Sequence, residues 1–359
     1  MHVFFNFNAL KFTYLEKIVI NTPGFRSEIH VGEKWERVTE LLPESGVAIV
    51  TDDNICRLYG DRFPDVPVFI VSHGEESKKL QVIEHLAEKL LEAGIDRNGF
   101  ILAVGGGVVS DLAGFLASIY MRGIRCGYIS TSLLSQVDAS TGGKNGVNLG
   151  GTKNILGNIR QPEFVFCDPV MLLSLPEDEY LSGLAELIKT AVIGDKELFE
   201  LIDLNYKGII DRDRNLLTTL VGKSISFKAS VVSIDERETG LRRILNFGHT
   251  YGHAIEMQMH LKHGFAVAAG MELATDYSYE RGLIALSEKE RIINLLNRFG
   301  LLEKHNIPDD QIDRLILHDK KKTGTGINFV FTVGIGEAMV EKVSIAEVID
   351  YYKRFRDKK

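Results

Sequence analysis

Short apolar runs alternate with amphipathic ones over the first half of the chain. The apolar runs are rich in β-branched residues and predict strands. They lie at residues 17–21, 47–50, 68–71 and 100–104. Residues 79–93 carry apolar side chains at helical spacing and lead to Gly94, which predicts a helix with a glycine just past its end. Strands that alternate with helices are typical of a parallel α/β sheet that binds ligands at the carboxyl ends of its strands.

The pattern becomes long and helical after Pro176. Apolar side chains at helical spacing predict several helices there. They cover residues 180–192, 216–232, 249–259, 267–281 and 287–299. Residues 327–333 resemble a strand or hairpin, and a charged terminal helix follows. We therefore expect an α/β domain over residues 1–175 and a mainly helical domain over residues 176–359.

The composition is that of a globular protein with substantial cores. Hydrophobic residues make up 45% of the 359 positions and charged residues 25%, which suits two folded domains. The net charge is −7, from 42 basic and 49 acidic residues. Because nucleic-acid binders are normally basic, this balance argues against that class. An anionic substrate would need a local cluster of cations.

Three features lead us to expect a cytoplasmic protein that is not inserted in a membrane. No apolar run approaches the roughly 18 residues that a membrane span needs. The hydrophobic N-terminus is interrupted by polar side chains and lacks the basic and small-residue parts of a signal peptide. Cys56, Cys126 and Cys167 match no zinc motif or disulfide framework, so we expect reduced thiols.

Gly105, Gly106 and Gly107 form a glycine turn between a predicted strand and a predicted helix. Such a turn lets a phosphate reach backbone N–H groups at the positive end of the helix. The dinucleotide fingerprint is incomplete, because Ser110 replaces its third glycine and no acid follows about 20 residues on. A pyrophosphate site and a plain tight turn both remain open. Asp52 with Asn54, after another strand, would either accept ribose hydroxyls or cap a helix.

Three histidines lie within 15 residues of one another, at His249, His253 and His263. The first two are four residues apart on one helix face. Thr250 stands where helix-borne metalloprotease motifs carry glutamate, which disfavours a protease. The group of three favours a metal or an anion site, whereas a structural role is the alternative for a single histidine. A catalytic zinc accepts imidazole and carboxylate ligands and keeps one position open. The carboxylate would be Glu186, which lies on an apolar helical stretch and is costly to bury unless it is paired or bound to metal.

Several cations stand beside glycine, asparagine or turn residues and are candidates for an anionic ligand. They are Arg122, Lys144, Lys153, Lys189, Lys228, Arg242 and the run 320–322. A solvated surface charge is the alternative for each of them. Lys144 in GGKNGVN and Lys153 in GGTKN are the better candidates, because glycine-rich flanks give an anion access to the backbone.

Taken in order, these segments resemble the 3-dehydroquinate synthase family of zinc- and NAD-dependent sugar phosphate cyclases. The resemblance covers about residues 45–335. LNFGHTYGHAIE and GLAELIK are its specific segments, whereas the glycine turn is shared with distant dehydrogenases of similar fold. The other matching segments are Gly74-Glu75-x-x-Lys78, GGGVVSDLAGF, MRGI, GGKNGVN, Lys153-Asn154, DERETG, His263-Gly264 and Asp319-Lys320-Lys321.

The resemblance implies a Rossmann-like NAD-binding domain followed by a mainly helical zinc- and substrate-binding domain. It implies zinc, or cobalt in its place, on Glu186, His249 and His263. Around a small anionic sugar phosphate it implies Arg122, Asp138, Lys144, Asn154, Lys189, Lys228, Arg242, Asn246, His253, Lys320 and Lys321. Along NAD it implies Asp52, Asn54, Glu75, Lys78, Gly106, Gly107, Asp111, Thr131, Ser132, Lys144, Lys153 and Ser174. We further expect a homodimer with no nucleic-acid partner.

The implied activity belongs to the shikimate pathway of aromatic amino acid biosynthesis. It converts 3-deoxy-D-arabino-heptulosonate 7-phosphate to 3-dehydroquinate and phosphate by transient oxidation, phosphate elimination, reduction and aldol cyclisation. Another sugar phosphate cyclase and a metal-dependent glycerol or alcohol dehydrogenase are the alternatives. Three positions depart from the family pattern: Asn145 replaces a usual threonine, Asp178 a common arginine and Phe265 a common glutamate.

Overall fold

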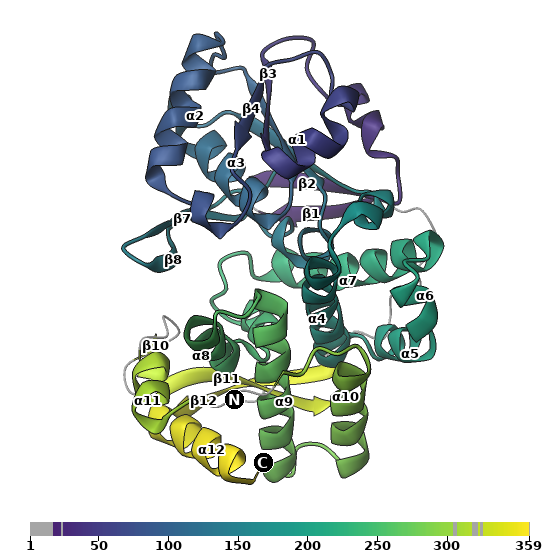
Figure 1. The fold of residues 1–359 in the computed structure, drawn as a ribbon, viewed down its shortest axis with the longest axis vertical. Coiled ribbons are helices and arrows are strands. Elements are labelled where there is room, and N and C mark those ends of the chain that lie inside the picture. The colour runs from purple at the N-terminus through teal and green to yellow at the C-terminus, as the bar shows by residue number, and fades with distance from the viewer. Residues whose placement is uncertain (1–16, 23, 304–306, 318–321, 324–325, 359) are drawn as a thin grey trace. The chain divides into compact units, whose positions relative to one another are not determined.

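The computed structural model describes residues 17–22, 24–303, 307–317, 322–323 and 326–358, which form two compact units (Figure 1). The α/β unit comprises Thr13–Leu175 and Arg212–Arg237. The helical unit contains Pro176–Asp211 and Glu238–Lys359. An α/β parallel-sheet domain followed by a mainly helical one is therefore confirmed.

The α/β unit is built on a seven-stranded sheet. In spatial order its strands are β1 (Ile18–Thr22), β2 (Phe25–Val31), β9 (Phe164–Cys167), β6 (Arg125–Ser130), β5 (Phe100–Gly105), β3 (Val47–Asp52) and β4 (Val68–Val71). Neighbours are parallel from β2 to β4, and β1 is an antiparallel edge strand on β2. Strands β3 and β5 are buried throughout, because both faces of a parallel sheet are covered.

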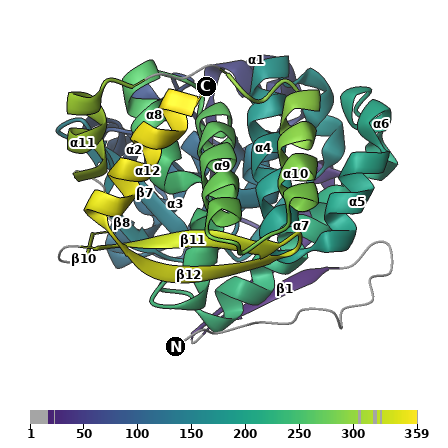
Figure 2. The ribbon, with the colours of Figure 1, turned by 90° about the horizontal axis from the view of Figure 1, so that it is seen from below.

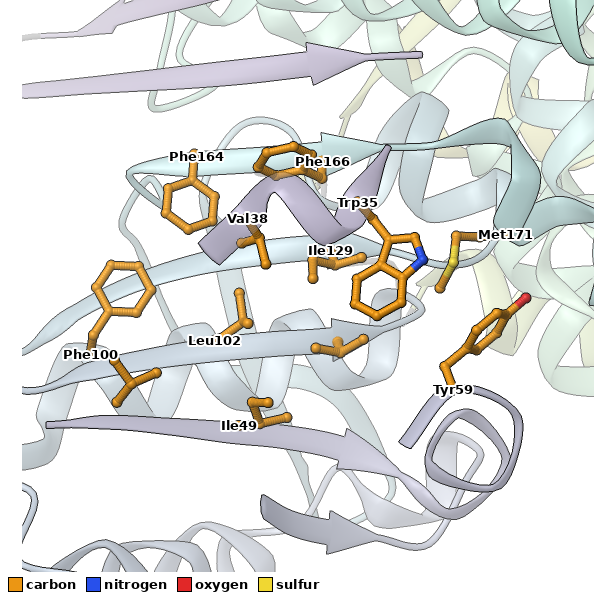
Figure 3. Packing of buried hydrophobic residues seen from close by; sticks show 12 residues of the cluster. Trp35, Val38, Ile49, Tyr59, Phe100, Leu102, Ile129, Phe164, Phe166 and Met171 are labelled. Carbon is orange, nitrogen blue, oxygen red and sulfur yellow. The ribbon is translucent and has the colours of Figure 1, made fainter. Parts of the chain in front are cut away.

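One face of this sheet packs an aromatic cluster, shown in Figure 3. Trp35 and Val38, from the short helix η1 (Trp35–Glu40), lie over side chains of the central strands. Phe164 and Phe166 of β9 pack edge to face, with ring centroids 5.9 Å apart. Two of the apolar runs that predicted strands contribute Val47, Ile49, Phe100, Leu102 and Val104 to this core.

The helices of the α/β unit follow its strands. They are α1 (Asp53–Tyr59), α2 (Leu80–Glu92), α3 (Gly107–Ile119) and α7 (Arg214–Ile234), with short turns η2 (Gly60–Arg62), η3 (Glu75–Ser77), η4 (Tyr120–Arg122), η5 (Ser135–Ala139) and η6 (Pro169–Ser174). A separate hairpin joins β7 (Lys144–Leu149) to β8 (Thr152–Ile159).

Helix α7 departs from the domain division expected from the sequence. The expectation placed every residue after 175 in the helical domain, but α7 belongs to the α/β unit. Its apolar side chains, among them Leu217, Leu220 and Val221, are fully buried, and the helix packs on β1, β2, η5 and η6. The packing of its apolar face, and not its position in the chain, therefore assigns α7 to the α/β unit. Lys228, which lies on α7, belongs to the α/β unit for the same reason.

The helical unit is arranged around α9 (His263–Glu280), which is buried along most of its length and contacts α4, α8, α10 and β11 (Figure 2). Its other helices are α4 (Glu177–Gly194), α5 (Lys196–Leu204), α6 (Tyr206–Ile210), η7 (Leu241–Asn246), α8 (His249–Met259), α10 (Leu286–Arg298), α11 (Asp309–Leu317) and α12 (Ile345–Lys358). A small antiparallel sheet contains β10 (Lys322–Thr323), β11 (Gly326–Gly334) and β12 (Glu337–Ser344). Among the described residues, we find no helix with the length and apolar character to cross a membrane.

Candidate active site

Three side chains converge in the helical unit with the geometry of a metal site. They are Glu186 in α4, His249 at the start of α8 and His263 at the start of α9, and one ligand atom from each lies within 4.8 Å of the others. Glu186 Oε1 is 3.1 Å from His263 Nε2 and 3.6 Å from His249 Nε2. The opposite ring nitrogens are engaged elsewhere, His249 Nδ1 with Phe247 O and His263 Nδ1 with Glu256 Oε2, each at 3.1 Å.

Two glycines let the three helices approach closely enough to bring these ligands together. Gly248 turns the chain into α8 at φ +78°, and a Cβ there would lie 2.7 Å from Met271 Cγ and 2.8 Å from Val267 O in α9. A Cβ on Gly264 would lie 2.0 Å from the carbonyl oxygen of Ser182 in α4. Because backbone atoms cannot move aside as a side chain does, both positions require glycine.

The charge around Glu186 suits a cation. The carboxylate is 0% exposed and forms an ion pair with Lys189, one helical turn further along α4. Burial opposes ionisation, but Lys189 and His263 outweigh it and hold the pKa of Glu186 well below its usual range. Burial also opposes the charged form of His263, yet Glu186 and Glu256 raise the pKa of this ring to about 10. A buried carboxylate with two converging imidazole nitrogens is a donor set that fits zinc.

His253 lies beside this cluster without joining it. Its ring centroid is 5.3 Å from that of His249 and 6.4 Å from that of His263. Its side chain is half-buried. The position places a further imidazole next to the three candidate metal ligands.

The remaining expected residues of the helical unit have varied surroundings. Lys189 is 1% exposed and lies against Glu186, and Arg242 in η7 is 2% exposed. Asn246, at the end of η7, donates a hydrogen bond from Nδ2 to Glu238 Oε1. Glu238 has a positive φ of 58°, and sequence reasoning gave it no role. Lys320 and Lys321 lie outside the described residues.

In the α/β unit, Asp52, Gly106 and Gly107 lie at the carboxyl ends of β3 and β5. The chain runs outward from β3 to β4, returns to β5 on the other side of β3, and continues to β6. This reversal makes β3 and β5 a topological switch point, where open α/β sheets bind ligands. Asp52 ends β3, and β5 leads into Gly106 and Gly107 at the start of α3.

A charged network lies in the same unit after β4. Lys78, 3% exposed, donates from Nζ to Asp111 Oδ2 at 2.6 Å. Burial raises the pKa of Asp111 to about 6, against the effect of Lys78. Glu75 Oε1 accepts a bond of 2.9 Å from Asn148 Nδ2, and Asn148 Oδ1 accepts the backbone N–H of Asn154 at 2.8 Å. Asn148 therefore joins Glu75 to Asn154, and its backbone N–H also donates to the carbonyl oxygen of Lys78 at 2.8 Å. Asn148 is the last residue of the segment GGKNGVN, but sequence reasoning gave it no role.

Asp138 and Lys228 form a second pair in this unit. Lys228 Nζ donates to Asp138 Oδ1 at 2.5 Å and to its carbonyl oxygen at 2.6 Å. Arg122 is exposed, in a turn where its φ is +70°, and Lys144 and Lys153 are also exposed.

Other residues expected along NAD make local hydrogen bonds. Asp52 Oδ1 accepts the Ile55 N–H at 2.9 Å, so Asp52 caps α1, as one of the two sequence interpretations held. Ser132 bonds to Ser135 at 3.0 Å, and Ser174 to Tyr59 at 2.7 Å. The Thr131 N–H donates to Gly105 O at 3.0 Å, and the exposed Asn54 accepts from Arg57.

Comparisons with known proteins show the family of this chain. Models described as 3-dehydroquinate synthase N-terminal and C-terminal match residues 68–182 and 183–322. A 3-dehydroquinate synthase of Thermoanaerobacter sp. is 40% identical over 330 residues, which is 89% of this chain and 93% of that protein. One from Dehalococcoides mccartyi is 38% identical over 342 residues, 91% of this chain and 95% of that protein. The chain belongs to the 3-dehydroquinate synthase family.

Solved structures show the same fold. A 2-deoxy-scyllo-inosose synthase complexed with carbaglucose-6-phosphate, NAD+ and Co2+ is 28% identical, with a TM-score of 0.84 over 94% of this chain and 100% of that chain. A 2-epi-5-epi-valiolone synthase from Streptomyces hygroscopicus with NAD+ and Zn2+ bound is 24% identical, with a TM-score of 0.84 over 98% of this chain and 100% of that chain. The second likeness concerns the fold alone.

Two of the departures from the family pattern have local partners. Asn145 is buried, where it accepts from Tyr128 Oη at 3.0 Å and donates to Gly143 O and Arg160 O at 2.8 and 2.9 Å. Asp178, in the first turn of α4, pairs with Lys262 at 2.5 Å. Nothing in the structure explains Phe265, which is half-buried on α9.

Proposed function

We propose that the protein converts 3-deoxy-D-arabino-heptulosonate 7-phosphate to 3-dehydroquinate and phosphate, using zinc and NAD. The observation that carries this proposal is the convergence of Glu186, His249 and His263 in a chain of this family. When bound, zinc would acidify the substrate hydroxyl to be oxidised, and NAD would accept and later return the hydride.

The protein's own residues would orient the substrate and neutralise its charge. The partly exposed His253 is placed to hydrogen-bond a phosphate, or to handle a proton near neutral pH. Arg242 and Asn246, just before α8 in the chain, would hold polar substrate groups. Lys189 is too buried and too closely tied to Glu186 to act as a mobile surface charge. Its role would be to hold Glu186 in the ionised form that a metal requires.

NAD would bind at the carboxyl ends of β3 and β5. The switch point and the glycine turn support this position. Lys78 and Asp111 would hold each other in place there, since a buried ion pair fixes both side chains. Gly106 and Gly107 would let the pyrophosphate approach the start of α3.

The test is turnover of the heptulosonate phosphate with NAD+ and zinc. We expect phosphate and 3-dehydroquinate in equal amounts without net NADH, because the hydride returns within each turnover. His249→Ala is the control, and it should release no phosphate. Net accumulation of NADH would indicate a dehydrogenase. Phosphate release from another sugar phosphate, but not from this one, would indicate a different cyclase.

The protein would work as a homodimer. In the part of the chain that the structure describes, β8 pairs with β7 alone, and the hairpin exposes Leu149, Ile155 and Ile159 by 51, 48 and 40%. An exposed apolar strand edge is suited to a second copy of the chain. Light scattering should give twice the chain mass, and Ile155→Lys should give a monomer. A dimer that persists in this variant would place the interface elsewhere.

The protein would act in the cytoplasm. Cys56, Cys126 and Cys167 are free thiols, and the last two are buried. Reduced cysteines suit a reducing compartment. Fractionation of the source cells should recover the protein with cytoplasmic enzymes, and recovery from an oxidising compartment would contradict the assignment.

A further inference from the structure

Glu256 contacts Nδ1 of His263, the ring nitrogen that does not face Glu186. It lies on α8, seven residues after His249, and its Oε2 is 3.1 Å from Nδ1 of His263. Its side chain is 12% exposed, whereas the His263 side chain is 31% exposed. The contact therefore joins the last turns of α8 to the first residue of α9.

His249 and His263 differ in the group that contacts their Nδ1 atom. His249 Nδ1 faces the backbone carbonyl of Phe247, a neutral acceptor, at 3.1 Å. His263 Nδ1 faces a carboxylate at the same distance. Either partner can accept a hydrogen bond from Nδ1–H, which leaves Nε2 as the nitrogen whose lone pair would bind a metal ion. A carboxylate does more, because its charge increases the basicity of the ring and hence its strength as a metal ligand.

The position of Glu256 distinguishes it from a fourth ligand. Its carboxylate is at Nδ1, while Glu186 Oε1 is at Nε2 of the same ring, 3.1 Å away. Packing of α8 against α9 does not depend on this contact alone, because Gly248 and Gly252 already lie close against the backbone of α9. The contact between Glu256 and His263 therefore affects mainly the orientation and the charge of the His263 ring.

We propose that Glu256 is a positioning residue that fixes the orientation of His263 and strengthens its bond to the metal. This inference rests on the proposed metal-binding role of Glu186, His249 and His263. Glu256 would form the outer member of a carboxylate–histidine–metal arrangement, and it would contact neither the metal nor the substrate.

The test measures metal binding directly, with Co2+ as the probe. The holoprotein is stripped with a chelator and titrated with Co2+, and the visible absorption of the bound ion is recorded. Glu256→Gln keeps the shape of the side chain and removes its charge, and Glu256→Ala removes the acceptor. Both should weaken Co2+ binding by about 10- to 100-fold, and the absorption bands should shift because the His263 ligand has changed.

Glu179→Gln is the matched control. It removes the same charge from a carboxylate that contacts Lys262, the residue before His263, at 2.7 Å, without touching the ring. Its Co2+ affinity and absorption spectrum should equal those of the unchanged protein. Glu256→Asp, which keeps the charge, should bind Co2+ more tightly than Glu256→Gln.

A Co2+ affinity and spectrum unchanged in Glu256→Gln would overturn the inference. Circular dichroism of each stripped variant separates weak binding from misfolding. If Glu256→Gln does not fold, the comparison rests on Glu256→Ala, where an affinity and a spectrum that both match those of the unchanged protein would count against the inference. If the unchanged protein binds no Co2+, the proposed metal role fails instead, and the two failures are thereby distinguished.

Discussion

Metal binding should release a proton from His263. In the structure this ring lies between the carboxylates of Glu186 and Glu256, which raise its pKa to about 10. A metal ion needs the Nε2 lone pair, so it can bind only after the proton on that nitrogen has left. The perturbation is therefore simple: metal is added to the stripped protein at a series of pH values.

The number of protons released follows from the raised pKa of His263 and the lowered pKa of Glu186. At about pH 7.5 the His263 ring is almost fully protonated, so each site should release about one proton. Glu186 contributes none there, since its lowered pKa keeps it ionised. The Kd for metal should then fall about tenfold for each pH unit from 7 to 9 and become constant near pH 10.

The same shift bears on the stability of the metal-free protein. Because the folded pKa of His263 exceeds its usual 6.5, its contribution to stability is complete below that pH and is lost as the pH rises through about 10. Urea unfolding of the stripped protein should show a fall in stability over this interval.

Calorimetry checks the proton count. Titrating Zn2+ at about pH 7.5 in buffers of different ionisation enthalpy gives the number of protons released. Glu256→Gln is the control, because it removes one of the two carboxylates that raise the pKa, so its Kd should become constant at a lower pH. Release of much less than half a proton, with a Kd that does not change between pH 7 and 9, would refute the reasoning.

Three further predictions concern single side chains. His253→Ala should keep its metal but lose about 10²–10⁴-fold in turnover, since the ring adjoins the ligands without being one; metal analysis beside phosphate release checks this, and loss of the metal would contradict it. Gly264→Ala should lower the free energy of unfolding by roughly 1–3 kcal/mol and weaken metal binding, because its Cβ would meet the Ser182 backbone. Gly222→Ala should be tolerated, because the atom nearest to its Cβ would be 3.9 Å away. Equal urea midpoints for the two variants would disprove the prediction. Asn145→Thr should lower the free energy of unfolding by about 1–3 kcal/mol, since threonine cannot donate to both Gly143 O and Arg160 O; an unchanged unfolding curve would exclude this role.

The convergence of Glu186, His249 and His263 could be predicted because these residues carry local signals. His249 begins a helix whose bounds, 249–259, match the prediction, and glycine precedes it where the chain has a positive φ. Glu186 could be chosen because a carboxylate on an apolar helix demands a partner. Glu256 also had a signal that was not used, since it lies seven residues after His249, two turns along the same face.

Other features could not be predicted because tertiary packing decides them. Strand β9 has only four residues, and β6 begins at an exposed arginine. The sequence pattern therefore does not predict either of them as a central strand. Helix α7 carries an apolar face that would suit either domain, and only contact with β1 and η5 assigns it. The departure at Asn145 became understandable only once its three partners were in view.

The charges around Glu186 explain how an acidic chain can hold an anion. Glu186 and Glu256 bring two negative charges to the cluster, and Lys189 with a protonated His263 balances them. When a divalent metal replaces the single proton on His263, the cluster gains one net positive charge. Because fields are strong in a buried, low-dielectric site, this one charge favours a phosphate or carboxylate far more than a surface lysine would. The net charge of −7 over the whole chain is therefore compatible with an anionic substrate, provided that the metal is bound.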